Sequence, residues 1–91
     1  MSRRPVFKFR LFVAGQAMNS LHAVTNLKAL CTQYLPDRYE IEIVDVYQLP
    51  KRALSEGVLM TPTLIKIAPS PVCRIVGTLS RTQTVLDALG V

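Results

Sequence analysis

Hydrophobic and polar residues alternate near the start of the chain, between Val6 and Val13. A period of two is typical of a strand that buries one face, and Lys8 and Arg10 fall on the other face. The residues of the apolar face are Phe7, Phe9, Leu11 and Val13. We therefore predict a half-buried strand here, which ends at Ala14-Gly15-Gln16.

The spacing then changes to that of a helix, which Pro36-Asp37 ends. Asn19 and Ser20 are both good N-cap residues for its start. The apolar residues at helical spacing are Leu21, Val24, Leu27, Cys31 and Tyr34. Alternation returns from Glu40 to Val46, so a second strand follows with Ile41 and Ile43 facing inward. Strand, helix and strand in this order predict a right-handed βαβ unit with parallel strands.

The second half of the chain reads as a short helix, two strands and a final helix. Pro50 suits the first turn of a helix that ends near Gly57. Strands are predicted at 63–67 and 73–76, and the Pro-rich connection between them favours an antiparallel hairpin. Ser80 and Gln83 fit a capping box for the last helix, and Gly90 is its stop. The apolar stripe of this helix is Val85, Leu86 and Leu89.

The predicted order is βαβαββα, which is the thioredoxin-like topology of the α/β class. With 91 residues, 49% of them apolar, the chain is expected to form a single domain over residues 1–91 with a real core. Lys8 and Arg10 interrupt the only apolar stretch near the N-terminus, so we predict no membrane span and a cytoplasmic protein.

The net charge of +5 favours acidic partners. The basic runs, Arg3-Arg4 and Lys51-Arg52, are only two residues long and lack interleaved aromatic residues, so we do not expect nucleic-acid binding. Surface cations are the candidates for contact with a protein partner. They are Lys51, Arg52, Lys66 and Arg74.

Catalytic chemistry is disfavoured because its usual groups are absent from the expected places. A thioredoxin-type thiolate would lie between the first strand and the first helix, and residues 15–20 contain no cysteine. Cys31 and Cys73 lie elsewhere, and His22 is the one histidine, with no second metal ligand at a suitable spacing. We predict a protein that is not an enzyme and binds no cofactor or metal, with a thiol-redox protein as a weaker alternative.

Three prolines, Pro62, Pro69 and Pro71, flank the strand at 63–67. X-Pro bonds interconvert slowly between cis and trans, so the cluster could act as a conformational lock. The alternative is that these prolines only shape turns.

Several segments together resemble the KaiB family. They are FRLFVAGQAMNS, IEIVDV, MTPTLIKIAPSPVCRIVGTLS and VLDALG, in family order across nearly the whole chain. The resemblance implies a non-enzymatic regulator that docks on a KaiC-like hexameric ATPase and kinase and shifts its phosphorylation state. It also implies competition with a histidine kinase that carries a KaiB-like domain. A thioredoxin-fold sensor module of such a kinase is the alternative function.

The resemblance further implies two folds, a thioredoxin-like binding state and a dimeric or tetrameric ground state that rebuilds the chain from about Pro50 onward. The fold-switch candidates are Thr61, Pro62, Pro69, Pro71 and Ala88. The chain departs from the family pattern at Ala17-Met18, Cys73, Thr78 and Ala88. Alanine favours a helix interior over the more common glycine by about 1 kcal/mol, so Ala88 is expected to favour the thioredoxin-like state.

Overall fold

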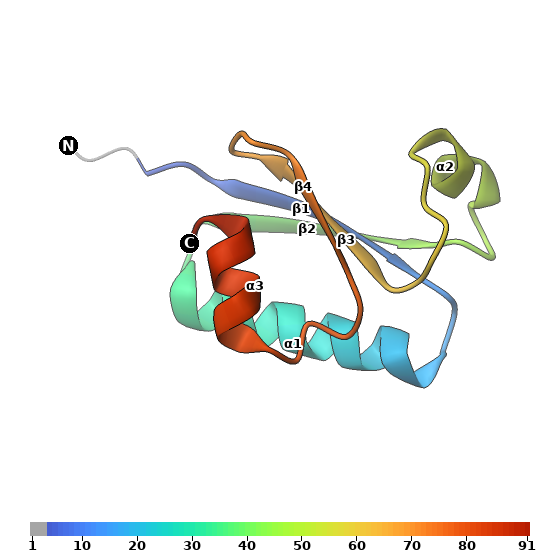
Figure 1. Cartoon of the computed structure of the whole chain (residues 1–91), viewed down its shortest axis with the longest axis horizontal. Helices are drawn as coiled ribbons and strands as arrows, with labels where there is room; N and C mark the ends of the chain where they lie inside the picture. Colours follow the sequence, from blue (N-terminus) through green and yellow to red (C-terminus); the bar gives the residue numbers. More distant parts are fainter. Residues whose placement is uncertain (1–3) are drawn as a thin grey trace.

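A computed structural model describes residues 4–91, so Arg3 of the predicted basic run lies outside the described residues. Seven elements follow one another along the chain (Figure 1). They are β1 (Phe7–Val13), α1 (Met18–Tyr34), β2 (Tyr39–Asp45), α2 (Pro50–Ser55), β3 (Thr63–Ala68), β4 (Cys73–Val76) and α3 (Thr82–Leu89). The predicted βαβαββα order is confirmed. No helix in the described part of the chain is long and apolar enough to span a membrane.

The four strands form one mixed sheet in the order β2-β1-β3-β4. β1 and β2 are parallel, in a register that runs from Phe7 opposite Tyr39 to Val13 opposite Asp45. β3 is antiparallel both to β1 and to β4. The predicted parallel βαβ unit and the antiparallel β3–β4 hairpin are therefore both present.

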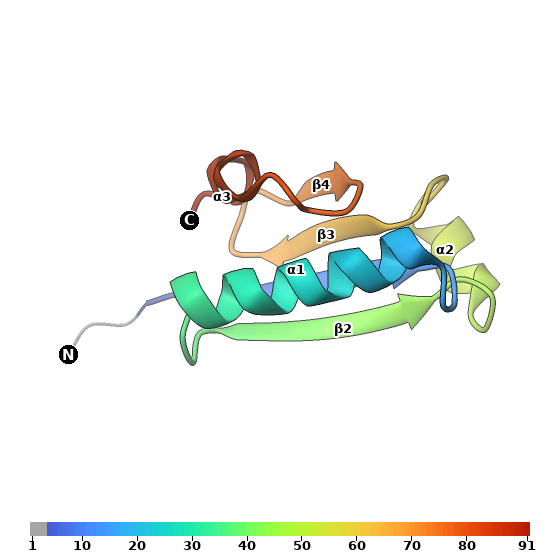
Figure 2. The ribbon, with the colours of Figure 1, turned by 90° about the horizontal axis from the view of Figure 1, so that it is seen from below.

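Helices cover both faces of the sheet. α1 and α3 lie on one face, and α2 lies on the other, beside the carboxyl ends of β1 and β2 (Figures 1 and 2). The larger core fills the α1 and α3 side, where Leu11, Leu27 and Leu89 are fully buried. A second, smaller core lies beneath α2 and consists of Phe12, Val44, Ala53, Val58 and Ile65.

The second core explains why one inward residue of β2 was predicted wrongly. Ile43 was expected to be buried, but 42% of it is exposed, whereas its neighbour Val44 is completely buried. β2 is an edge strand, so α1 does not fully cover its outer side, while α2 shields the opposite face. Phe12 is buried in the same second core, although alternation alone placed it on the polar face of β1.

The buried face of α1 is rotated from the predicted one. Leu27 and Cys31 are buried as expected, but Leu21 and Tyr34 are exposed. The helix begins at Met18, and Ser20 does not cap it; instead the Ser20 hydroxyl accepts a hydrogen bond from the Ala14 amide at 3.0 Å. Small and apolar residues on several sides of the helix made the apolar stripe ambiguous.

The start of α3 also differs from the prediction, because no side chain caps it and Arg81 occupies the N-cap position. Ser80 accepts a hydrogen bond from the Thr78 hydroxyl at 3.3 Å instead of completing a capping box. The end of the helix is as predicted. Gly90 adopts φ of 75°, a left-handed conformation that suits glycine.

Candidate functional site

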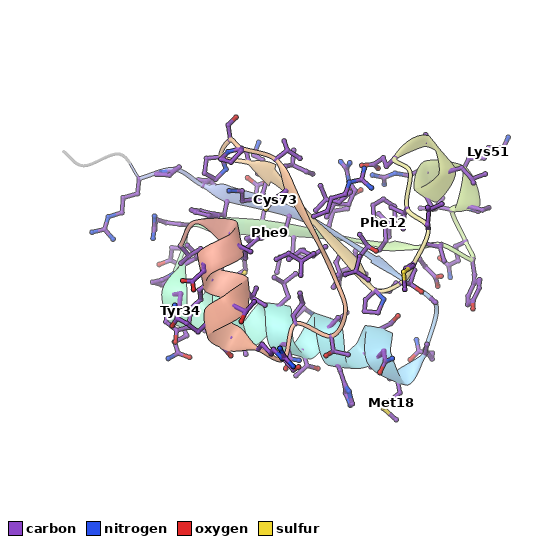
Figure 3. The ribbon with its side chains drawn as sticks, viewed as in Figure 1. Phe9, Phe12, Met18, Tyr34, Lys51 and Cys73 are labelled. Carbon is purple, nitrogen blue, oxygen red and sulfur yellow. The ribbon has the colours of Figure 1, made fainter. Side chains whose placement is uncertain are left out.

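The four predicted contact cations lie in very different surroundings. Lys51 is exposed on α2, and its side chain points outward (Figure 3). Within residues 4–91 it makes no hydrogen bond or ion pair. Lys51 is therefore the predicted cation that is most available to an acidic partner.

Lys66 was predicted to be a surface cation, and this is wrong for the conformation described. It is only 3% exposed, and its Nζ donates a hydrogen bond to the carbonyl oxygen of Leu89 at 2.9 Å. The Phe7 ring lies 5.7 Å from the same ammonium group, within the range of a cation–π interaction. Alternation along β3 could not reveal this, because the acceptor is the last residue of α3, far away in the sequence.

Arg52 belongs to a network of two arginines and two glutamates, here called the α2 charge network: Arg10, Glu42, Arg52 and Glu56. Arg52 binds both carboxylate oxygens of Glu42, at 2.6 and 2.9 Å. Arg10 donates to Glu42 at 2.7 Å and to Glu56 at 2.6 Å. Hydrogen bonds from Arg52 and Arg10 lower the pKa of Glu42 to about 2. The network joins α2 to β1 and β2.

Arg74 also reaches the end of α2, on the same face of the sheet but from the opposite edge strand, β4. Its guanidinium donates to the backbone carbonyl of Gly57 at 3.3 Å and to that of Glu56. These carbonyls follow directly on the C-terminal end of α2. Arg52 and Arg74 are thus occupied with intramolecular contacts.

A surface that sequence reasoning missed surrounds α2. Five large apolar side chains on α2 and its flanking loops form this α2 surface: Tyr47, Leu49, Leu54, Leu59 and Met60. Their exposed fractions run from 46% for Leu49 to 91% for Leu59. Leu59 and Met60 border a shallow hollow of about 270 Å³ together with Val76 of β4. The hint in the sequence was the apolar run Val58-Leu59-Met60 in a predicted loop.

A single carboxylate fixes the loop that leads to this surface. One oxygen of Asp45 accepts hydrogen bonds from the amides of Gly15 at 3.2 Å and Tyr47 at 2.9 Å. Asp45 thus joins the β1–α1 loop to the β2–α2 loop. Its role here is structural.

The two thiols are buried to different degrees. Cys31 is fully buried in α1, and desolvation raises its pKa to about 11. Cys73 is half-buried on β4, with its Sγ 3.6 Å from the Ala88 carbonyl oxygen. Among residues 4–91 no three His, Cys, Asp or Glu side chains cluster to hold a metal ion. Nucleophilic thiol chemistry needs an accessible thiolate, which the buried Cys31 does not provide.

The fold-switch candidates lie in the C-terminal half. Pro62 is buried and Thr61 half-buried just before β3, while Ala88 is exposed on α3. Pro69 and Pro71 shape the β3–β4 connection. The peptide bonds before all three prolines are cis.

Comparisons with solved structures identify the fold. The N-terminal domain of SasA from Synechococcus elongatus matches with a TM-score of 0.76 and 19% identity, over 96% of this chain and 83% of that one. A chloroplastic thioredoxin z matches with a TM-score of 0.76 and 21% identity, over 96% and 78%. The predicted thioredoxin-like fold is confirmed.

Sequence comparisons identify the family. The KaiB domain model matches residues 10–91. Circadian clock protein KaiB3 of Synechocystis sp. is 42% identical over 82 residues, which cover 90% of this chain and 80% of that protein. A circadian clock oscillator protein KaiB of Prochlorococcus marinus is 39% identical over 89 residues, covering 98% and 76%. The chain therefore belongs to the KaiB family, and these relatives are circadian clock proteins.

Proposed function

We propose that this protein is a non-enzymatic regulator that docks on a KaiC-like hexameric ATPase and kinase in the cytoplasm and shifts its phosphorylation state. Membership of the KaiB family supports a role in clock or related timing regulation. The observation that carries the docking step is the α2 surface, with its exposed apolar side chains beside the free ammonium group of Lys51.

The composition of the α2 surface supports a protein partner. Leu54 and Leu59 are 75% and 91% exposed, and such large apolar side chains gain free energy when a partner removes them from water. Lys51 lines one hollow with Leu49, and exposed apolar side chains beside a cation suit a partner surface that is apolar with a carboxylate nearby. Lys51 is the proposed partner of that carboxylate. Arg52 and Arg74 are proposed to support the α2 surface through their contacts inside the protein, without touching the partner.

Size-exclusion chromatography with a KaiC-type hexamer and ATP tests the docking step. Leu54→Glu replaces the exposed apolar side chain of α2 itself with a charge and is expected to abolish the complex. Val72→Glu is the matched control, because Val72 is 63% exposed in the β3–β4 connection, away from α2. Equal binding by both variants would exclude the α2 surface, and no complex with wild-type protein would exclude the proposed partner.

We also propose a slow change of fold before docking, in which the C-terminal half rearranges from an oligomeric ground state. The C-terminal half holds the candidates Thr61, Pro62, Pro69, Pro71 and Ala88. Ala88→Gly is expected to lower the thioredoxin-like population, since Ala88 lies in the last turn of α3 and glycine costs up to about 1 kcal/mol in a helix. Ala29→Gly is the control, because it lies on α1, which the family resemblance implies is kept in both folds. Backbone NMR shifts over residues 50–91 measure the populations, and equal effects of both variants would argue against the switch.

A histidine kinase with a KaiB-like domain is a proposed competitor for the same site. Adding such a domain to a preformed complex should displace this protein in proportion to concentration. Simultaneous binding of both would contradict shared use of the site.

A further inference from the structure

We propose that Arg10 and Arg74 are positioning residues, which hold α2 in the orientation needed for docking through what we call the α2 latch. The latch consists of the α2 charge network together with the two hydrogen bonds from Arg74 to the end of α2. This inference rests on the proposed function for its consequence in binding, but the latch itself is tested on the free protein.

α2 needs a latch because its own packing is slight. The helix spans only six residues, Pro50–Ser55, and Ala53 is its one buried residue. Helices this short are not stable on their own in water. Beneath it, the second core adds only Val58 from the same segment. Apolar burial therefore fixes α2 at one point near its C-terminal end.

Polar contacts from three different strands reach Arg52 of α2 and the two residues that follow the helix. Arg10 on β1 binds Glu56, and Glu42 on β2 binds Arg52 through two hydrogen bonds. Arg74 on β4 binds the carbonyl oxygens of Glu56 and Gly57. Contacts from three strands restrict rotation and translation of the helix, which a single ion pair could not do.

The ion pairs of the latch have a geometry in which surface charges do contribute to stability. Isolated exposed ion pairs add little, whereas forked arginine–carboxylate pairs and networks add more. Arg10 is a shared donor, with its Nε on Glu42 and its Nη1 on Glu56. The side chains of Arg10 and Glu56 are each only 25% exposed, so water competes less for them than for a free surface pair.

The latch bears directly on the α2 surface. Leu54 lies within α2, and Leu59 and Met60 follow the carbonyls that Arg74 binds. Arg74 and Met60 also border the same shallow hollow. Loss of the latch would leave the apolar side chains present but free to move, and the partner would then have to order them at a cost in affinity.

Hydrogen exchange on the free protein tests the latch. The reporters are the amides of Glu56, Gly57 and Val58, which donate to carbonyls of Arg52, Leu54 and Ala53. Removing charged donors to backbone carbonyls changes a local opening equilibrium by about tenfold or more. Arg74→Gln is expected to speed exchange at these three amides by that factor, and Arg10→Gln should act in the same direction.

Arg81→Gln is the matched control, since it also removes one positive charge but lies at the N-cap of α3, where it makes no side-chain hydrogen bond within residues 4–91. Amides of β1 provide the internal reference for global stability. Arg74→Lys should protect the three reporter amides from exchange better than Arg74→Gln but less than wild type, because an ammonium group cannot reproduce the planar fork of the guanidinium.

Binding to a KaiC-type hexamer then gives the functional result. Arg74→Gln and Arg10→Gln should each raise the Kd for the hexamer by about tenfold, and Arg81→Gln should leave this Kd unchanged. Unaltered exchange at the reporter amides in both variants would overturn the latch. Weaker binding without faster exchange would mean that Arg74 contacts the partner directly, and would also overturn it. Faster exchange with no binding by wild-type protein would leave the latch standing and refute the proposed partner.

Discussion

Protonation of Glu42 should weaken the fold at acidic pH, and the structure sets both the direction and the pH range. The two arginine partners of Glu42 lower its pKa from 4.5 to about 2. Above pH 4.5 the carboxylate is charged in both the folded and the unfolded chain, and its contribution to stability is fully present. That contribution is lost as the pH falls from about 4.5 towards 2, because the unfolded chain takes up the proton first.

The size of the effect follows from the shift and from exposure. A shift of this size would correspond to about 3 kcal/mol without screening. The Glu42 side chain is 48% exposed, so solvent screening reduces the expected contribution to about 1 kcal/mol. Glu42→Gln should therefore lower the free energy of unfolding by about 1 kcal/mol at neutral pH. The difference from wild type should shrink by more than half near pH 3.

Urea unfolding followed by circular dichroism at pH 7, 4 and 3 measures this difference. Glu40→Gln is the matched control, because Glu40 is exposed on the same strand and has no hydrogen bond within residues 4–91. A difference between Glu42→Gln and wild type that stays constant from pH 7 to pH 3 would refute the reasoning. So would an equal loss from Glu40→Gln.

Three further outcomes are expected. Lys66→Ala should lower the free energy of unfolding by about 2 kcal/mol, because the Leu89 carbonyl loses its charged donor. Lys28 is exposed on α1, so Lys28→Ala should change the free energy of unfolding little, and thermal melts compare the two variants. Alkylation of the native protein with iodoacetamide should modify Cys73 well before Cys31, whose thiol is buried with a pKa of about 11; equal rates by mass spectrometry would contradict this. Gly15→Ala should cost about 1 kcal/mol in urea unfolding, because φ is +52° and the new methyl group would lie 3.3 Å from Tyr47.

The order of the elements could be predicted from the sequence because the period of the apolar residues and the residues that end an element are local signals. The alternation of β1, the helical spacing of α1 and the stop at Gly90 all depend on neighbouring residues. Which side of an element is buried depends instead on what packs against it. Ile43 and Leu21 were misassigned for this reason, since one lies on an edge strand and the other on a helix with apolar residues on several sides.

The candidate site was less predictable, because charge does not reveal its own partners. Four cations looked alike in the sequence, yet among the residues that the structure describes Lys51 has no partner, while Arg52 and Arg74 hold α2 in place. Lys66 is buried because residue 89 supplies an acceptor through the packing of α3 on the sheet. Such pairings join distant parts of the chain, and no spacing rule identifies them.

The burial of Lys66 has a practical consequence as a chemical footprint. The chain has four lysines, and Lys8, Lys28 and Lys51 are exposed while Lys66 is not. Besides the α-amine, an amine-reactive label should therefore mark three lysines and skip Lys66 for as long as α3 stays docked on β3. A rearrangement that carries α3 away removes the Leu89 acceptor and the cover that α3 gives this amine. One mass spectrum of the labelled protein would then count the molecules in each arrangement, without an isotope, a partner or a mutation.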